Sequence, residues 1–186
     1  MLKENYILNN GFGLEIYDSS EINIEKNELN SNNSLGMQIT ACASLKIRKN
    51  INSNNSLGIV VKGCNTIIIS ENEIKNNKKK GLNLIESNEN QILNNIIINN
   101  GSGLELSNSN NNLVEKNNIS FNTSDGLSIF ESMNNQVIEN QSIKNKCGIY
   151  LDRSRENSII RNKLKPNIED EILLFNSRGN EFEYSY

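Results

Sequence analysis

One glycine recurs along the chain at a nearly constant interval, and this periodicity restricts the possible folds more than any other feature. The glycine precedes an apolar-x-apolar triplet at Gly13, Gly36, Gly58, Gly81, Gly103, Gly126 and Gly148, with successive intervals of 23, 22, 23, 22, 23 and 22 residues. An asparagine follows each of them after 14 residues, at Asn27, Asn50, Asn72, Asn95, Asn117, Asn140 and Asn162. A period of this length predicts a stack of equivalent structural units.

The repeat also accounts for two similar octapeptides. "NNGFGLEI" starts at Asn9 and "NNGSGLEL" at Asn99, 90 residues later. A glycine-rich phosphate loop would need a third glycine between a strand and a helix, and neither sequence has that context. Because the intervals alternate between 22 and 23 residues, two units span 45 residues, and the octapeptides are the same corner in equivalent units.

Each unit contains short alternating apolar segments separated by Asn, Ser and Gly, which indicates strands rather than helices. Three segments fit one unit, at one to four, about nine to twelve, and fourteen to seventeen residues after the glycine. The sequence therefore predicts an all-β fold, a right-handed parallel β-helix of about eight coils with three short strands per coil. We expect one domain over residues 1–186, either complete or a fragment of a longer solenoid.

Polar and small residues are predicted to form columns at the corners of the stack. The asparagines fourteen residues after the glycine should bond to each other and to turn backbone groups. A second asparagine column is confined to the later units, at Asn90, Asn112, Asn135, Asn157 and Asn180. A serine column includes Cys42 and Cys64, one coil apart and within disulfide range. We favour small residues filling a serine corner and leave a disulfide as the alternative.

Composition removes several classes of function. The net charge of -3 and the pI near 5.2 give no general attraction to nucleic acid, and no segment is long and apolar enough to insert into a membrane. The chain has no histidine, which excludes Ser-His and Cys-His nucleophile pairs and the HExxH zinc site. Its three cysteines lack metal-site spacing. We predict no metal and no cofactor, with calcium as the one ion worth testing.

The segment "GLNLIESNENQILNNIIINNGSGLEL", residues 81–106, resembles the right-handed parallel β-helix repeats of the pectate-lyase-like superfamily. It is especially similar to the NosD-like and the carbohydrate-binding and sugar-hydrolase (CASH) domains. The resemblance extends from Asn5 to about Phe182. Its relatives include polysaccharide lyases, glycoside hydrolases, uronan epimerases, adhesins and phage tail proteins, so it implies a fold more strongly than an activity.

The chain departs from the catalytic signatures of these families. The Tyr-Gly-x-Asp-Pro-His segment of alginate epimerases and the Gly-His-Gly of polygalacturonases are absent, and the one proline is Pro166. The four aspartates, Asp18, Asp125, Asp152 and Asp170, are too scattered in the sequence for an obvious calcium cage or acid–base pair. The resemblance to NosD implies metallocluster assembly, but only the cysteines offer soft ligands.

The outer face of the first strand is the predicted binding surface, because related folds hold glycans there. Aromatic rings on this face could stack on sugars, and its polar groups could bond hydroxyls or a uronate carboxylate. The glycan-binding candidates are Tyr17, Lys62, Asn83, Glu105, Phe130, Tyr150, Asp152 and Arg153. A solvated sheet with mixed polar residues is the simpler interpretation, and it includes an exposed Glu131–Arg153 ion pair.

Apolar residues on the outer face of the second strand suggest contact with a partner, because alternation would place polar residues there. They are Ile68, Leu93, Leu113, Ile138 and Ile160. A register error of one residue is the alternative. Coils without clear caps at either end suggest self-association, either as a homo-oligomer or end to end.

These observations favour a noncatalytic module that binds polysaccharide or cell-surface glycan, or that is an adhesive or structural element. One alternative is a polysaccharide-modifying enzyme of the uronan lyase or epimerase type. A second is a scaffold that docks another protein or assembles with itself. We expect an extracellular or cell-surface location, although "MLKENYILNN" at the N-terminus is not a secretory signal.

Overall fold

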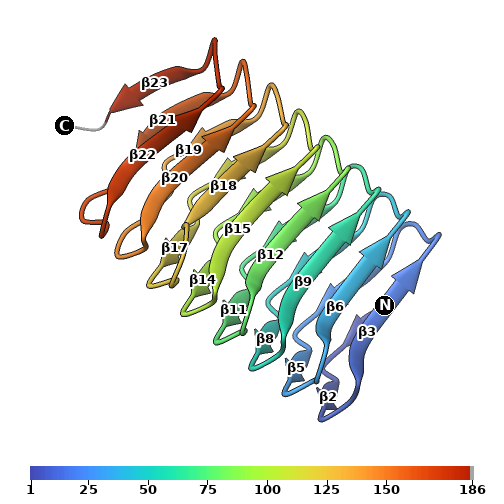
Figure 1. Ribbon diagram of the computed structural model, residues 1–186. Helices are drawn as coiled ribbons and strands as arrows, with labels where there is room; N and C mark the ends of the chain where they lie inside the picture. The colour runs from blue at the N-terminus through green and yellow to red at the C-terminus, as the bar shows by residue number, and fades with distance from the viewer. Residues whose placement is uncertain (185–186) are drawn as a thin grey trace.

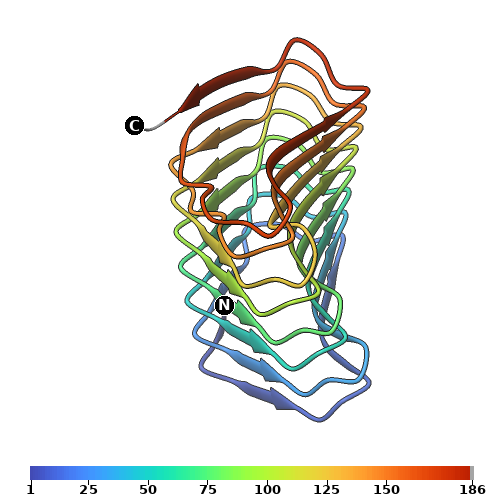
Figure 2. The same cartoon turned by 60° about the vertical axis from the view of Figure 1, so that its left-hand side comes forward.

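The computed structural model describes residues 1–184, which form parallel strands and no helix (Figure 1). The chain winds into a right-handed β-helix of about eight turns, with the first and the last described strands at opposite ends of the stack (Figure 2). No helix in this part of the chain is long and apolar enough to cross a membrane. The predicted fold class is confirmed. Tyr186, where the sequence pattern ends, lies outside the described residues.

Sheet 1 contains eight strands, most of six residues, and six of them start at the residue before a repeating glycine. They are β3 (Phe12–Tyr17), β6 (Leu35–Thr40), β9 (Leu57–Lys62), β12 (Lys80–Ile85), β15 (Ser102–Ser107), β18 (Leu127–Phe130), β20 (Cys147–Asp152) and β22 (Asp170–Phe175). In Figure 1 they form the row of large arrows that runs from blue to red. This sheet provides the broadest outer face of the coil.

Sheets 2 and 3 are built from shorter strands. Sheet 2 contains β1 (Leu2–Lys3), β4 (Asn23–Glu25), β7 (Lys46–Arg48), β10 (Ile68–Ser70), β13 (Gln91–Leu93), β16 (Leu113–Glu115), β19 (Gln136–Ile138), β21 (Ser158–Asn162) and β23 (Glu181–Tyr184). Sheet 3 contains β2 (Tyr6–Leu8), β5 (Glu28–Asn30), β8 (Ile51–Ser53), β11 (Glu73–Lys75), β14 (Ile96–Ile98) and β17 (Asn118–Ser120).

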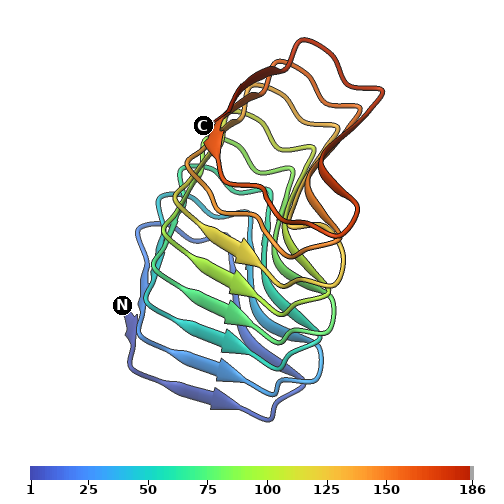
Figure 3. The ribbon, with the colours of Figure 1, turned by 90° about the vertical axis from the view of Figure 1, so that its left-hand side faces the viewer.

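Sheet 3 ends before the other two sheets, so three strands per coil hold only as far as β17 (Figure 3). Beyond β17, the equivalent positions Gln141 and Lys163 form isolated parallel bridges in place of strands. The next corner contains Leu164 and a cis peptide bond between Lys165 and Pro166, where earlier coils have alternating strand residues. The final coils therefore depart from the regular repeat.

Identical positions of neighbouring coils are paired, as the repeat predicts. Ile69 of β10 pairs with Ile47 on one side and Ile92 on the other, and all three side chains are fully buried. The core is a stack of such aliphatic columns, from Ile16 to Leu164. Burial of these side chains supplies most of the stabilising free energy, because the hydrophobic contribution follows the apolar area removed from water.

Asparagine ladders connect the coils inside the corners. Asn27 donates from its backbone N and its Nδ2 to Oδ1 of Asn50, at 2.9 and 3.0 Å, and Asn50 repeats this with Asn72. The residue before each of these asparagines has positive φ, as at Lys26 and Lys49. A left-handed conformation is unfavourable for such residues, and the ladder bonds offset it.

The structure contains a third asparagine ladder that the sequence analysis missed. Its members after the first stand nineteen residues after a repeating glycine, and Asn10 precedes the first of these glycines. They are Asn10, Asn32, Asn55, Asn77, Asn100, Asn122, Asn145 and Asn167. The repeating glycines pack against it. A Cβ on Gly103 would lie 2.3 Å from the carbonyl oxygen of Gly126 and 3.0 Å from Nδ2 of Asn122. Close approach between coils therefore explains the glycine period.

Cys42 and Cys64 are small corner residues, as we favoured, and these two and Cys147 are free and buried. Cys42 N donates to Cys64 Sγ at 3.2 Å, and Cys64 N donates to Ser87 Oγ at 3.1 Å. The thiols therefore occupy the same place in the hydrogen-bonded column as the serine hydroxyls.

Candidate functional site

Two rows of side chains project from the outer face of sheet 1. In one row Asn83 pairs with Glu105, Glu105 with Ser128, and Ser128 with Tyr150. In the other, Ser107 pairs with Phe130, and Phe130 with Asp152. Coils are stacked about 4.8 Å apart, so side chains on β15, β18 and β20 reach the same region of the face.

A depression of about 310 Å³ lies over these strands and is called the sheet 1 groove here. It is lined by Glu105, Ser107, Asp125, Ser128, Ile129, Phe130 and Tyr150. Strands contribute all of these residues except Asp125, which comes from the turn directly before Gly126 and β18. The groove combines an aromatic surface with two carboxyl groups, two hydroxyls and a phenol.

Asp125 is the most perturbed carboxyl group of the groove. Partial burial raises its pKa above the ordinary value, and the nearby charge of Glu105 raises it further. Ser128 Oγ donates to Asp125 Oδ2 at 3.2 Å and opposes this shift, as does Lys146 through its charge, but burial dominates. Asp125 therefore keeps its proton to a higher pH than an exposed aspartate does.

The other carboxylate of the groove has a cation beside it. Lys80 Nζ lies 2.5 Å from Glu105 Oε1. Across the groove, burial raises the pKa of the Tyr150 phenol, and the charges of Asp152 and Asp125 add to this. A carboxyl group with a raised pKa thus lies in the same depression as an ion-paired carboxylate and a phenol.

Arg153 closes the sheet 1 groove at its C-terminal side. Its guanidinium stacks over the Phe130 ring at 4.4 Å from the ring centroid. Its Nη1 is 3.2 Å from Glu131 Oε1, which confirms the predicted ion pair. Its Nε is 3.4 Å from Asp152 Oδ1, although that oxygen has no hydrogen bond among the described residues.

Of the predicted glycan-binding residues, the structure gathers Glu105, Phe130 and Tyr150 in the groove, with Asp152 and Arg153 on its border. Asn83 is next to Glu105 but is buried and 7% exposed. The other two do not line the groove.

Lys62 and Tyr17 lie on earlier coils, and the Tyr17 hydroxyl bonds to Glu15 at 2.8 Å. Sequence reasoning missed Asp125, Ser128 and Lys80. The aspartate was noted only as one of four scattered aspartates. A signal was available in its position, because Asp125 and Lys80 both stand directly before the repeating glycine.

The five partner-contact candidates point outward, which excludes a register error, because they alternate with buried residues such as Ile69 and Ile92. They are half-buried. They do not form a continuous stripe: Gln91 separates Ile68 from Leu113, and Glu115 separates Leu93 from Ile138. Only Ile138 and Ile160 are direct neighbours. Contact with a partner at these residues stays a prediction.

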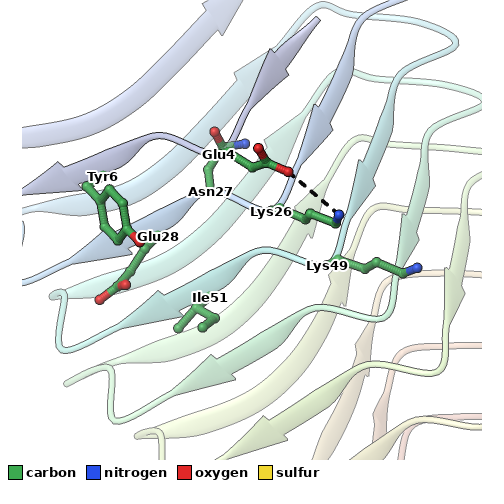
Figure 4. Close-up of a pocket in the computed structure, with 7 residues that line it drawn as sticks. All are labelled: Glu4, Tyr6, Lys26, Asn27, Glu28, Lys49 and Ile51. Carbon is green, nitrogen blue, oxygen red and sulfur yellow. Dashed lines mark ion pairs between the residues drawn. The ribbon is translucent and has the colours of Figure 1, made fainter.

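A second depression, of about 230 Å³, lies on the first coils (Figure 4). Its lining residues are Glu4, Tyr6, Lys26, Asn27, Glu28, Lys49 and Ile51. Lys26 pairs with Glu4 at 3.6 Å, and Lys49 pairs with Glu71 at 3.6 Å. Both lysines of this depression are therefore already ion-paired.

Fold and groove together define a right-handed parallel β-helix of the pectate-lyase-like type. The chain belongs to the family described as periplasmic copper-binding protein (NosD), whose profile matches residues 34–183. The predicted resemblance is confirmed. No curated protein matches the sequence.

Several solved structures share this fold. The periplasmic alginate epimerase AlgG has a TM-score of 0.92 and 20% identity, over 97% of this chain and 48% of that one. DFA-IIIase from Arthrobacter chlorophenolicus A6, in complex with GF2, has a TM-score of 0.84 and 16% identity, over 94% and 51%. The A-module of the mannuronan C-5 epimerase AlgE6 from Azotobacter vinelandii has a TM-score of 0.77 and 18% identity, over 96% and 55%. The chain thus spans about half the length of each, and at these identities the likeness shows the fold alone.

The residues of this chain do not fit the copper ion in the family's description. Copper is held by thiolate, thioether or imidazole ligands. The chain has no histidine, and its three methionines, Met1, Met37 and Met133, lie on different coils. The three cysteines are buried, and burial raises the pKa of Cys64 and raises that of Cys147 to about 11. Within residues 1–184, no three His, Cys, Asp or Glu side chains gather where they could hold a metal. We therefore derive no chemistry through copper.

Proposed function

We propose that this chain binds a polysaccharide in the sheet 1 groove and acts on it by proton transfer at a sugar ring. The observation that carries the proposal is the position of Asp125, a half-buried carboxyl group with a raised pKa, in the same groove as Glu105. Two carboxyl groups whose environments differ can divide the roles of acid and base. This favours the modifying-enzyme alternative over the noncatalytic module.

Each group in the groove has a role suited to its chemistry. Glu105, which is paired with Lys80, would take the proton from the ring carbon beside a uronate carboxylate. A C=C bond would form as the bond between the neighbouring ring carbon and the glycosidic oxygen breaks, and Asp125 would donate its proton to that leaving oxygen. Phe130 and Tyr150 would stack on sugar rings, and Ser128 would bond a hydroxyl. The aspartates are scattered in the sequence, but the acid–base pair here combines an aspartate with a glutamate of the preceding coil.

The related structures support a polysaccharide substrate, because they are described as epimerases of alginate and mannuronan and as a DFA-IIIase. We also propose that the protein acts in the periplasm or outside the cell. The family's description and that of AlgG both name the periplasm.

Polysaccharide binding without turnover is the second candidate. The short Lys80–Glu105 ion pair favours it, because Lys80 already occupies one oxygen of the carboxylate that would have to accept a proton. The two candidates share the groove and differ only in whether the bound polymer changes.

The test is to incubate the purified chain with alginate, polygalacturonate and inulin and to follow the polymers by proton NMR. Asp125→Asn removes the proton donor, and Asp18→Asn is the matched control, because Asp18 is exposed on the first coil. Conversion lost only in Asp125→Asn supports the proposal. Binding without conversion of any polymer selects the binding module, and no binding in calorimetry would refute both candidates.

A further inference from the structure

A third depression, of about 190 Å³ and lined by polar residues, lies beside the sheet 1 groove and is called the arginine pocket. It is lined by Arg153, Ser154, Arg155, Asn176 and Arg178. Three of the five arginines in the chain therefore converge at one corner of the last two coils. This concentration is unexpected in a chain with a net charge of -3.

Arg155 and Arg178 face each other directly, because the two residues form a parallel bridge between neighbouring coils. Like charges directly opposite each other on adjacent strands are destabilising. In the same column of the earlier coils the residues are uncharged, as at Asn110 and Met133. The two arginines are thus a local departure from the repeat that weakens the stack when nothing is bound.

Neither Arg155 nor Arg178 has an acidic partner within residues 1–184. Arg155 Nη2 contacts only the sulfur of Met133, at 4.0 Å, and Glu156 forms no ion pair with either arginine. Arg153 differs, because Glu131 and Asp152 already neutralise it. Both unpaired guanidiniums are exposed at the pocket, so their donors are available to a ligand.

We infer that the arginine pocket binds a carboxylate or sulfate group carried by a polysaccharide, with Arg155 and Arg178 as its main ligands. Guanidinium groups hold such oxyanions through paired, charge-assisted hydrogen bonds. The anion would also relieve the repulsion between the two arginines. Arg153 stacks on Phe130 of the sheet 1 groove, so the pocket and the groove adjoin, and one extended polymer can occupy both.

This inference rests on the proposed function for the polymer and narrows it to acidic chains. Calorimetry would compare oligogalacturonate, a sulfated oligosaccharide and neutral inulin oligosaccharides, at fixed and low ionic strength. We expect the double variant Arg155→Gln/Arg178→Gln to bind the acidic oligosaccharides about tenfold or more weakly. Arg161→Gln is the matched control, because Arg161 is an exposed arginine already paired with Glu139 at 3.2 Å. It should bind as the unmodified protein does.

The outcomes separate the inference from the proposed function. If the double variant binds acidic oligosaccharides unchanged, or if the protein binds only neutral ones, the pocket has been misassigned and the groove proposal stands. If no oligosaccharide binds, both fail. The relative affinity for the carboxylated and sulfated probes identifies which group the pocket takes. A melting temperature of the double variant at or above that of the unmodified protein shows that weaker binding does not reflect unfolding.

Discussion

Replacing one ladder asparagine by alanine tests whether the asparagines hold the coils together. Asn95 is fully inside the stack, and its side chain takes part in four hydrogen bonds. Its Oδ1 accepts from N and Nδ2 of Asn72, both at 3.0 Å, and its Nδ2 donates to Ile69 O and Asn117 Oδ1, both at 2.9 Å. Asn95→Ala removes all four.

The cost follows from what remains after the substitution. Asn72 Nδ2 keeps its bond to Ile47 O, and Asn117 Oδ1 keeps the bond from the backbone N of Asn95. The backbone N of Asn72 has no other partner among the described contacts and stays buried. An unpaired buried donor costs about 1–3 kcal/mol. With the other lost bonds, we expect the free energy of unfolding to fall by about 2–4 kcal/mol.

Urea unfolding followed by far-ultraviolet circular dichroism measures this loss, and hydrogen exchange at the Asn72 amide localises it. Asn33→Ala is the matched control, because Asn33 is exposed and its side chain makes no hydrogen bond with the described residues. It should change stability by about 0.5 kcal/mol or less. Equal effects of the two substitutions, or an Asn72 amide that stays fully protected in Asn95→Ala, would show that the ladder does not stabilise the stack.

Three further predictions follow from the structure. The pKa of Asp125 is raised on folding, so the native state holds this proton more tightly than the unfolded state does. The free energy of unfolding should therefore fall as pH rises from the ordinary aspartate range through the folded pKa. In a pH series of urea unfolding curves, Asp125→Asn should lack this pH-dependent fall. Gly103→Ala should destabilise by about 1–3 kcal/mol or more because its Cβ meets the next coil, whereas Gly11→Ala, with nothing within 4 Å, should be nearly neutral in thermal unfolding. Cys42, Cys64 and Cys147 are all free and buried, so a thiol reagent should modify them only in denaturant. Rapid modification of the native protein would contradict their burial.

Most of the fold could be predicted from the sequence because every coil must repeat the same register. Leu82 and Leu104 share a core column since strands in neighbouring coils pair position by position. The third ladder was also predictable from the sequence, because its asparagines stand nineteen residues after the glycine as regularly as the first column stands fourteen residues after it. The early end of sheet 3 could not be predicted, because it arises from irregular packing after β17 rather than from a change in the period.

The site was harder to predict than the fold, because the repeat assigns residues to a face and not to a place along it. Tyr17 and Tyr150 face the same side, yet they lie six coils apart, or about 29 Å at the usual spacing of strands. Asp125 belongs to a turn, where the alternating pattern says nothing about direction. Its pairing with Glu105 depends on how that turn folds over β15, which periodicity does not determine.

The proposed binding sites extend from regular coils into the coils that depart most from the repeat. Regular positions are occupied by what stacking requires: aliphatic residues inside, asparagine or serine in the corners, and glycine where coils approach closely. Asp125 and Tyr150 add nothing to that stacking, and the bridge between Arg155 and Arg178 opposes it. Tyr150, Arg155 and Arg178 lie in the last coils, where sheet 3 has already given way to isolated bridges, and Asp125 follows β17, the last strand of that sheet. Residues that a repeat does not need, or that weaken it, are best explained by a ligand, so this end of the solenoid is where binding should be measured.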